Sequence, residues 1–230
     1  MKSTHNFQQQ LEGISEKILR LGGLVEEAIG KSVRALVDRD SALAGEVVAG
    51  DAEIDRLELE IDDLCVEVLA RNQPLARDLR FLCTTMKITP DLERIGDHAV
   101  NISERAIELN NEPPLRTLVD MPLMASRAQQ MVRGALDAFV RHDSDAARAV
   151  IQMDDELDQR MEQTFRVLLS HMIENPTTIS RALRLTFVAK YFERIGDQAT
   201  NICEQIVYMN DATVIKHRPD SRQRGEASSR

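Results

Sequence analysis

Glu-Arg-Ile-Gly-Asp stands at residues 93–97 and returns unchanged at residues 193–197, an offset of 100 positions. The segment before it also repeats, because Asp40-Ser41 returns as Asp143-Ser144 at an offset of 103. The second repeat is therefore three residues shorter than the first around the turn between these two segments. Self-similarity over this distance indicates a duplicated structural unit rather than a chance match of one short motif. We read the chain as a tandem duplication.

Apolar residues run through the repeated motif at alternating steps of three and four. The stripe in this segment consists of Ile88, Leu92, Ile95, Ala99, Ile102, Ala106 and Leu109. Such spacing predicts long amphipathic helices packed side by side. The 230 residues include 10 Gly, 7 Pro, no Trp and only 3% aromatic residues, which argues against an all-β fold. We expect an all-α protein of two tandem three-helix bundles, six long antiparallel helices in all, with a single six-helix bundle as the alternative.

Polar and proline-containing stretches separate the expected helices. Asp40 is placed to cap the second helix, and Asn-Gln-Pro at residues 72–74 separates the second from the third. Asn-Asn-Glu-Pro-Pro at residues 110–114 is the clearest linker. We therefore expect a first three-helix bundle over residues 1–112, a second over 113–212, and a basic disordered tail over 213–230.

Charge and cysteine content narrow the class of protein. The net charge is −9, and residues 1–213 alone hold 24 basic and 36 acidic residues, a net charge of −12. An acidic body repels phosphate backbones, so we expect no direct nucleic-acid binding. The three cysteines lack Cys-x-x-Cys spacing, and the sequence holds neither a signal core nor a membrane-spanning apolar run. These features favour the cytoplasm.

Each repeat carries two pairs of acids spaced i, i+4, which places each pair on one helix face. Asp55 and Glu93 are each 19 residues from Pro74, and Asp51 and Asp97 are each 23 residues from it. An antiparallel hairpin therefore gathers these four carboxylates at one level, about 30 Å from its turn. The second repeat shows the same register about the bond between residues 175 and 176. The eight acids are Asp51, Asp55, Glu93, Asp97, Asp154, Asp158, Glu193 and Asp197.

Four carboxylates at one level need a positive partner. All-oxygen ligation predicts a hard cation, Mg²⁺, Mn²⁺, Ca²⁺ or an iron ion, at an open surface site. The absence of Glu-x-x-His argues against a ferritin-like di-iron centre. Asn101 and Asn201, one turn beyond the motif, are candidates to add an oxygen or a hydrogen bond. The alternative is neutralisation by neighbouring arginines, namely Arg56, Arg94, Arg160 and Arg194.

The doubled motif, with Asp91-Leu92 before its first copy and His98-Ala99 after it, resembles the PhoU family of phosphate-signalling proteins. Gln-Pro-Leu-Ala-Arg-Asp-Leu-Arg at residues 73–80 is similar to that family's turn into its third helix, and the similarity spans about residues 5–210. The resemblance implies two three-helix bundles that carry multinuclear metal clusters on their surfaces. The family's ligands come from E(D)xxxD motifs, which here are the eight acids given above.

The resemblance also implies a function. Members of the family are cytoplasmic accessory proteins, often homodimers, that reach the inner membrane through their partners. They link the ATPase side of the phosphate ABC transporter to a sensor histidine kinase, and they restrain both when phosphate is abundant. Negative regulation of phosphate transport and phosphate homeostasis is therefore the expected role.

Two features depart from the family pattern, and two other functions compete. Pro90 lies three residues before Glu93, inside the motif helix, where proline removes a backbone hydrogen bond. The basic tail lies outside the resemblance.

We expect no catalytic residues, because the sequence shows neither a nucleophilic triad nor a glycine-rich phosphate loop. The alternatives are a Mg²⁺-dependent all-α nucleotide pyrophosphohydrolase and a helical scaffold without metal.

Overall fold

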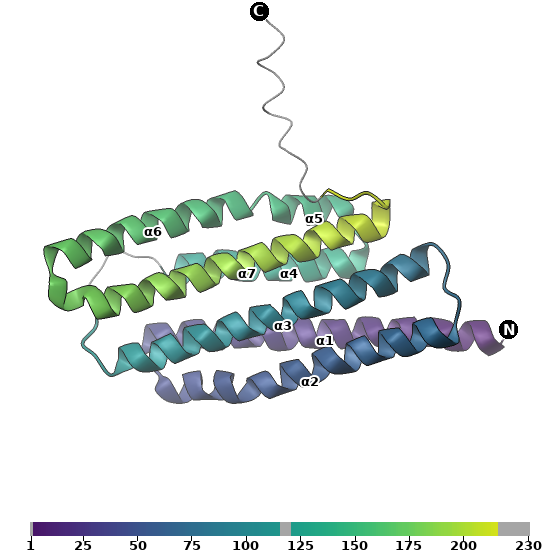
Figure 1. Ribbon diagram of the computed structural model, residues 1–230, viewed down its shortest axis with the longest axis horizontal. Helices are drawn as coiled ribbons and strands as arrows, with labels where there is room; N and C mark the ends of the chain where they lie inside the picture. The colour runs from purple at the N-terminus through teal and green to yellow at the C-terminus, as the bar shows by residue number, and fades with distance from the viewer. Residues whose placement is uncertain (1, 116–120, 216–230) are drawn as a thin grey trace, which may run out of the picture.

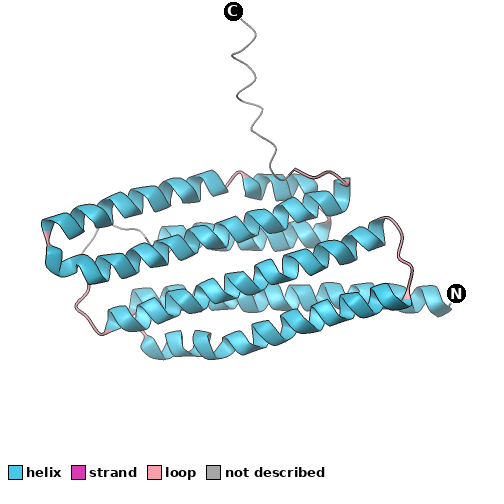
Figure 2. Cartoon of the chain, in the orientation of Figure 1, coloured by secondary structure: helices cyan, strands magenta, loops and turns pink. Residues whose placement is uncertain are grey.

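The structure, a computed structural model, describes residues 2–115 and 121–215, and most of these residues are helical. The α-helices are α1 (Lys2–Asp38), α2 (Ser41–Arg71), α3 (Arg77–Asn110), α4 (Met121–Arg141), α5 (Ser144–Ile151), α6 (Asp154–Glu174) and α7 (Ile179–Asp211), with a short 3₁₀ turn at Pro176–Thr178. No strand occurs in the part of the chain that the structure describes (Figure 2). The expected all-α class is confirmed. Most of the expected basic tail, residues 216–230, lies outside the described residues.

The helices form two three-helix units that share one core. Helices α1, α2 and α3 make the first unit, and α4, the α5–α6 segment and α7 make the second. Figure 1 shows α2, α3, α7 and α6 side by side in front, with α1 and α4 behind them. Contacts between α3 and α7, and between α1 and α4, join the units into one hydrophobic cluster. The six-helix plan is therefore two bundles with a continuous core.

The fifth of the six expected helices is interrupted, which the sequence pattern did not predict. Helix α5 ends at Ile151 and α6 begins at Asp154. Between them, the amide of Met153 donates to the carbonyl of Val150 at 2.9 Å, a tighter turn than the α-helical pattern. Three acids, Asp154 among them, then occupy the first turn of α6, where unpaired backbone amides favour negative charge.

Residues at the unit ends tie neighbouring helices together. Asp40 caps α2 as expected, because its side chain accepts the amides of Ala42 and Leu43, and Asp143 caps α5 in the same way. Arg39, which has a positive φ of 57°, donates to three carbonyls at the end of α3, those of Leu109, Asn110 and Glu112. The start of α2 is thereby held against the end of α3.

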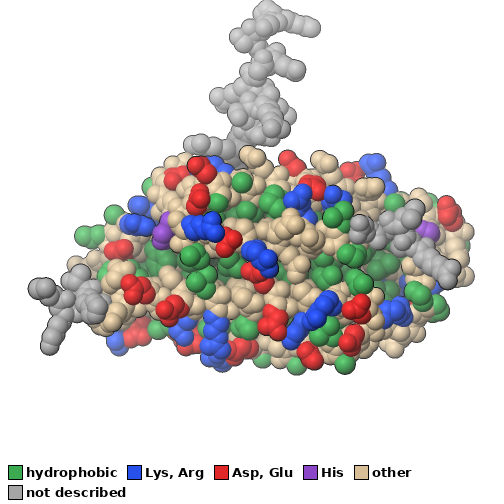
Figure 3. All heavy atoms as spheres, turned by 180° about the vertical axis from the view of Figure 1, so that it is seen from behind, with side chains coloured by type: hydrophobic (Ala, Val, Ile, Leu, Met, Phe, Trp, Pro, Cys, Tyr) green, Lys and Arg blue, Asp and Glu red, His purple; other side chains and the backbone are tan. Residues whose placement is uncertain are grey.

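The core is aliphatic, and α1 packs closely against α4 at a glycine. A Cβ on Gly22 of α1 would lie 2.6 Å from Leu136 Cδ1 of α4, so the Leu136 side chain would have to move to admit a larger residue. Figure 3 shows the back of the molecule, where acidic and basic side chains are interspersed. Ion pairs between Lys17 and Glu60 and between Arg133 and Glu26 link α1 to α2 and α4 to α1. No helix in the described part of the chain is long and apolar enough to cross a membrane.

Candidate metal-binding sites

The α2–α3 hairpin brings together the two acidic pairs of the first unit. Asp51 and Asp55 lie on α2, and Glu93 and Asp97 lie on α3; we call these four residues the first carboxylate site. Burial, and then the charges of Asp55 and Asp97, raise the pKa of Asp51 to about 6. Burial also raises the pKa of Asp97, with Asp55 as the second cause. The register counted from Pro74 therefore places the four acids within electrostatic reach of one another.

Glu58 is an acid near this site that the sequence analysis missed. Burial raises the pKa of Glu93 to about 7, and the charges of Asp97, Asp55 and then Glu58 act in the same direction. The pKa of Glu58 is itself raised by burial and by nearby acids. The spacing of Asp55 and Glu58 at i, i+3 was the available signal. The second repeat has Met161 at the equivalent position, so the duplication offered no support.

The second unit repeats the arrangement between α6 and α7. Asp154, Asp158, Glu193 and Asp197 form the second carboxylate site. Burial, followed by the charges of Asp158, Asp197 and Glu193, raises the pKa of Asp154 to about 7. Burial and Glu193 likewise raise the pKa of Asp158 and of Asp197. In each unit, the four predicted acids are thus close enough for their charges to act on one another.

Both sites contain buried carboxylate oxygens without hydrogen-bond partners. The equivalent oxygens Asp51 Oδ1 and Asp154 Oδ1 are in this state, and so is Glu193 Oε2. A buried anionic oxygen without a donor is costly, and a bound cation removes that cost. The donors are all carboxylate oxygens, the ligands that hard cations prefer. In the type of donor atom, these residues fit a hard metal ion.

The motif glycines allow the paired helices to approach at these oxygens. A Cβ on Gly96 would lie 3.0 Å from Ile54 Cδ1 and 3.6 Å from Asp51 Oδ1. A Cβ on Gly196 would lie 2.6 Å from Leu157 Cδ2 and 3.1 Å from Asp154 Oδ1. The glycine in each motif therefore serves close contact between the two helices of its hairpin.

The carboxylates are not arranged as a complete set of metal ligands. Within residues 2–115 and 121–215, no three His, Cys, Asp or Glu side chains converge closely enough to hold a metal ion. Like charges repel, which opposes a close approach of neighbouring carboxylates when no cation lies between them. Metal binding at either site therefore requires the carboxylates to rotate, which side chains at a helix surface can do.

Three of the four neighbouring arginines form ion pairs outside the two sites. Arg56 pairs with Glu53 and Glu60, and Arg94 pairs with Asp91. Arg160 pairs with Glu156, which also pairs with Arg127. Arg194 helps to lower the pKa of Asp197 against the larger raising effects of burial and Glu193. Three of the four arginines in the alternative interpretation thus bind acids outside the two sites.

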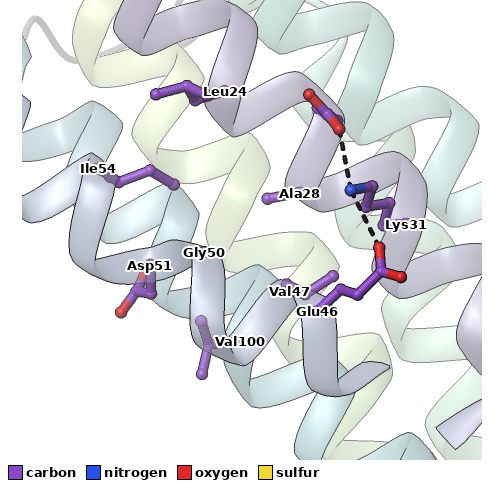
Figure 4. A pocket seen from close by; sticks show the side chains of 10 residues that line it. Leu24, Ala28, Lys31, Glu46, Val47, Gly50, Asp51, Ile54 and Val100 are labelled. Carbon is purple, nitrogen blue, oxygen red and sulfur yellow. Dashed lines mark ion pairs between the residues drawn. The ribbon is translucent and has the colours of Figure 1, made fainter. Parts of the chain in front are cut away.

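Lys31 is also held away from the first site. It lines a small pocket of about 100 Å³ that also contains Asp51. Figure 4 shows Lys31 and Asp51 on opposite sides of this pocket. The ammonium of Lys31 pairs with Glu27 at 3.0 Å and Glu46 at 3.3 Å. Asp51 therefore borders a cation that two other carboxylates already bind.

Lys190 is the cation at the second site that the sequence analysis missed. Its ammonium group forms an ion pair with Glu193 Oε1. It also counteracts the raised pKa values of Asp158 and Asp197, in which burial and Glu193 are the larger causes. The i, i+3 spacing of Lys190 and Glu193 was a usable signal. The equivalent position in the first repeat is Pro90, so a comparison of the two repeats gave no indication of this lysine.

The residues that flank the two motifs have different surroundings. Asn101 and Asn201 lie half-buried, one turn beyond the motif on α3 and α7. His98 stacks on Tyr191 with ring centroids 5.8 Å apart, and burial lowers its pKa to about 4. It therefore belongs to the α3–α7 contact. Helix α3 continues through Pro90, so the proline does not separate Glu93 from the rest of the site.

Fold and site together define an internally duplicated helical protein with one open carboxylate site in each half. Comparison with known families matches the PhoU domain twice, at residues 18–106 and 121–206. The chain therefore belongs to the PhoU family.

Two relatives and two solved structures support this assignment. The phosphate-specific transport system accessory protein PhoU homolog of Pseudomonas aeruginosa is 42% identical over 220 residues, which cover 93% of this chain and 90% of the relative. The corresponding PhoU of Escherichia coli is 36% identical over 211 residues, with coverages of 92% and 88%.

The crystal structure of PhoU from Pseudomonas aeruginosa matches with a TM-score of 0.87 at 42% identity, over 90% of this chain and all of that one. A phosphate transport system regulatory protein PhoU from Streptococcus pneumoniae matches with a TM-score of 0.83 at 27% identity, over 91% of this chain and 99% of that one. These similarities extend over both units.

Proposed function

We propose that this protein is a metal-binding accessory regulator of phosphate uptake. Its relatives are named phosphate-specific transport system accessory proteins, and the similarity extends over nearly the whole chain. In this proposal the protein acts in the cytoplasm as a homodimer, without catalysis. It docks on the ATPase of the phosphate ABC transporter and on the sensor histidine kinase, and it restrains both when phosphate is abundant.

One observation carries the metal part of the proposal. Asp51 Oδ1 and Asp154 Oδ1 are equivalent atoms in the two repeats, and both are buried without a hydrogen-bond partner. A single such oxygen could be incidental to packing. Its recurrence at the same position, beside a motif glycine in each half, favours a shared ligand. Asp51, Asp55, Glu93 and Asp97 would hold the ion in the first unit, and Asp154, Asp158, Glu193 and Asp197 would hold it in the second.

The metal ion would make the docking surface rigid and would take no part in a reaction. A bound Mg²⁺, Mn²⁺, Ca²⁺ or iron ion supplies positive charge that offsets the mutual repulsion of the carboxylates. The carboxylates then hold α2 to α3 and α6 to α7 at the level of the motifs. A rigid face costs less ordering entropy when a partner docks. The proposed role of the eight acids is therefore to preorganise the docking face.

The test is repression of a phosphate-starvation reporter in cells that lack the protein. Wild type should restore repression in phosphate-rich medium, whereas Glu93→Ala/Asp97→Ala should not, although it keeps its helical circular dichroism signal. Asp63→Ala/Glu67→Ala removes two acids of α2 outside both sites and serves as the control. Full repression by the folded Glu93→Ala/Asp97→Ala variant would contradict the role of the first site.

A further inference from the structure

The duplication relates the two carboxylate sites, but one position gives them different charge. Lys190 on α7 forms an ion pair with Glu193 of the second site, whose side chain is 15% exposed. The equivalent position in the first unit, 100 residues earlier, is Pro90. A proline side chain carries no charge and no donor. Glu93 therefore receives no such cation from its own helix.

The number of acids does not offset this difference. The first site has Glu58 nearby, where the second repeat has Met161. The second site has Asp155 nearby, where the first repeat has Ala52. Each site therefore has five carboxylates within electrostatic reach. Lys190, together with the smaller effect of Arg194 on Asp197, is the charge difference that remains.

The helix break adds to the asymmetry. Asp154 is the first residue of α6, so it lies beside backbone amides that have no partner within the helix. The positive end of the helix dipole lies at such a helix start and stabilises a carboxylate there. Asp51 lies well inside α2, which begins at Ser41, and no helix start supports it. The second site thus has three sources of positive charge that do not act on the first site: Lys190, Arg194 and this helix start.

We infer that the two sites bind metal with different affinities, and that Lys190 sets the difference. The first carboxylate site fills first. The second fills only when Glu193 exchanges Lys190 for the metal ion, and the displaced ammonium then remains close to that ion. This inference rests on the metal binding proposed above. A unit charge near a divalent ion at a hydrated surface corresponds to a difference of about tenfold in affinity.

The experiment is a titration of the metal-free full chain with Mn²⁺, in which calorimetry measures binding and electron paramagnetic resonance counts free Mn²⁺. Asp154→Asn/Asp197→Asn leaves the first site alone, and Asp51→Asn/Asp97→Asn leaves the second. We expect Mn²⁺ to bind the first site about tenfold more tightly than the second. In the second-site background, Lys190→Met should raise Mn²⁺ affinity about tenfold. In the first-site background, Pro90→Lys should lower it by a similar factor.

Lys87→Met provides the matched control. Lys87 lies on α3 one turn before Pro90, and its ammonium lies over the Tyr208 ring, 5.4 Å from the centroid. Removing this lysine should change neither affinity. Equal affinities in the two backgrounds, or no effect of Lys190→Met, overturns the inference while metal binding stands. No Mn²⁺ binding to wild type overturns the proposed metal-binding function, and the inference with it.

Discussion

Asp51 on α2 and Asp154 on α6 occupy equivalent positions in the two repeats, and each buries its Oδ1 atom without a hydrogen-bond partner. Each oxygen also lies where the Cβ of a larger residue at the facing motif glycine would approach it. Two hairpins with different neighbours have thus kept the same unsatisfied oxygen. Stability in the metal-free protein should therefore depend on these sites, in ways that can be measured.

Metal should stabilise the fold. A ligand that binds only the folded state at 100 times its dissociation constant adds about 2.7 kcal/mol. For a chain of this size we expect saturating Mn²⁺ to raise the Tm by roughly 5–10 °C. Differential scanning calorimetry of wild type and of Asp51→Asn/Asp97→Asn/Asp154→Asn/Asp197→Asn measures this rise. A Tm shift of the same size in the quadruple variant would place the metal elsewhere.

The metal-free protein should lose stability as the pH rises from 4 to 7. The folded pKa values of Asp51, Glu93 and Asp154 are raised to about 6, 7 and 7, above the ordinary values of 3.8, 4.5 and 3.8 for these side chains. In this window the folded state binds more protons than the unfolded state, so the free energy of unfolding falls with increasing pH. Urea unfolding in EDTA at pH 5.0 and 7.5 measures the slope. The variant Asp51→Asn/Glu93→Gln/Asp154→Asn should show a smaller change in the free energy of unfolding with pH. An unchanged slope would mean that other groups cause the pH dependence.

Gly196→Ala should destabilise the protein, whereas Gly45→Ala should stabilise it. The new Cβ at position 196 meets Leu157 Cδ2 at 2.6 Å, and overpacking of this kind costs about 1–3 kcal/mol. Nothing lies within 4 Å of the Cβ position at Gly45 inside α2, so only the helix preference for alanine, up to about 1 kcal/mol, remains. Urea unfolding of both variants gives the comparison. Stabilisation by both would show that the α6–α7 contact yields easily.

Arg39→Ala should destabilise the protein by about 1–3 kcal/mol, because three carbonyls at the end of α3 lose a charged donor. Arg71→Ala is the control. Arg71 makes an i, i+4 pair with Glu67, and its side chain is 70% exposed, so its loss should cost about 0.5 kcal/mol or less. Equal costs in chemical unfolding would mean that Arg39 does not join α2 to α3.

Much of the site could be predicted from the chain because helix geometry is regular. Counting residues from Pro74 was enough to bring Asp55 level with Glu93, since both helices of a hairpin rise by the same distance per residue. The caps at Asp40 and Asp143 were readable for a similar reason, because a cap depends on residues two or three positions away. Neither prediction needed knowledge of the rest of the fold.

The sequence by itself determined the duplication, the helical class and the level of the eight acids, because these follow from local spacing. Only the tertiary structure decided that α3 packs on α7, that α1 packs on α4, and that Lys17 of α1 binds Glu60 of α2. It also decided the break before Asp154. A long charged side chain reaches several partners of similar energy, and burial and neighbours from distant segments select among them.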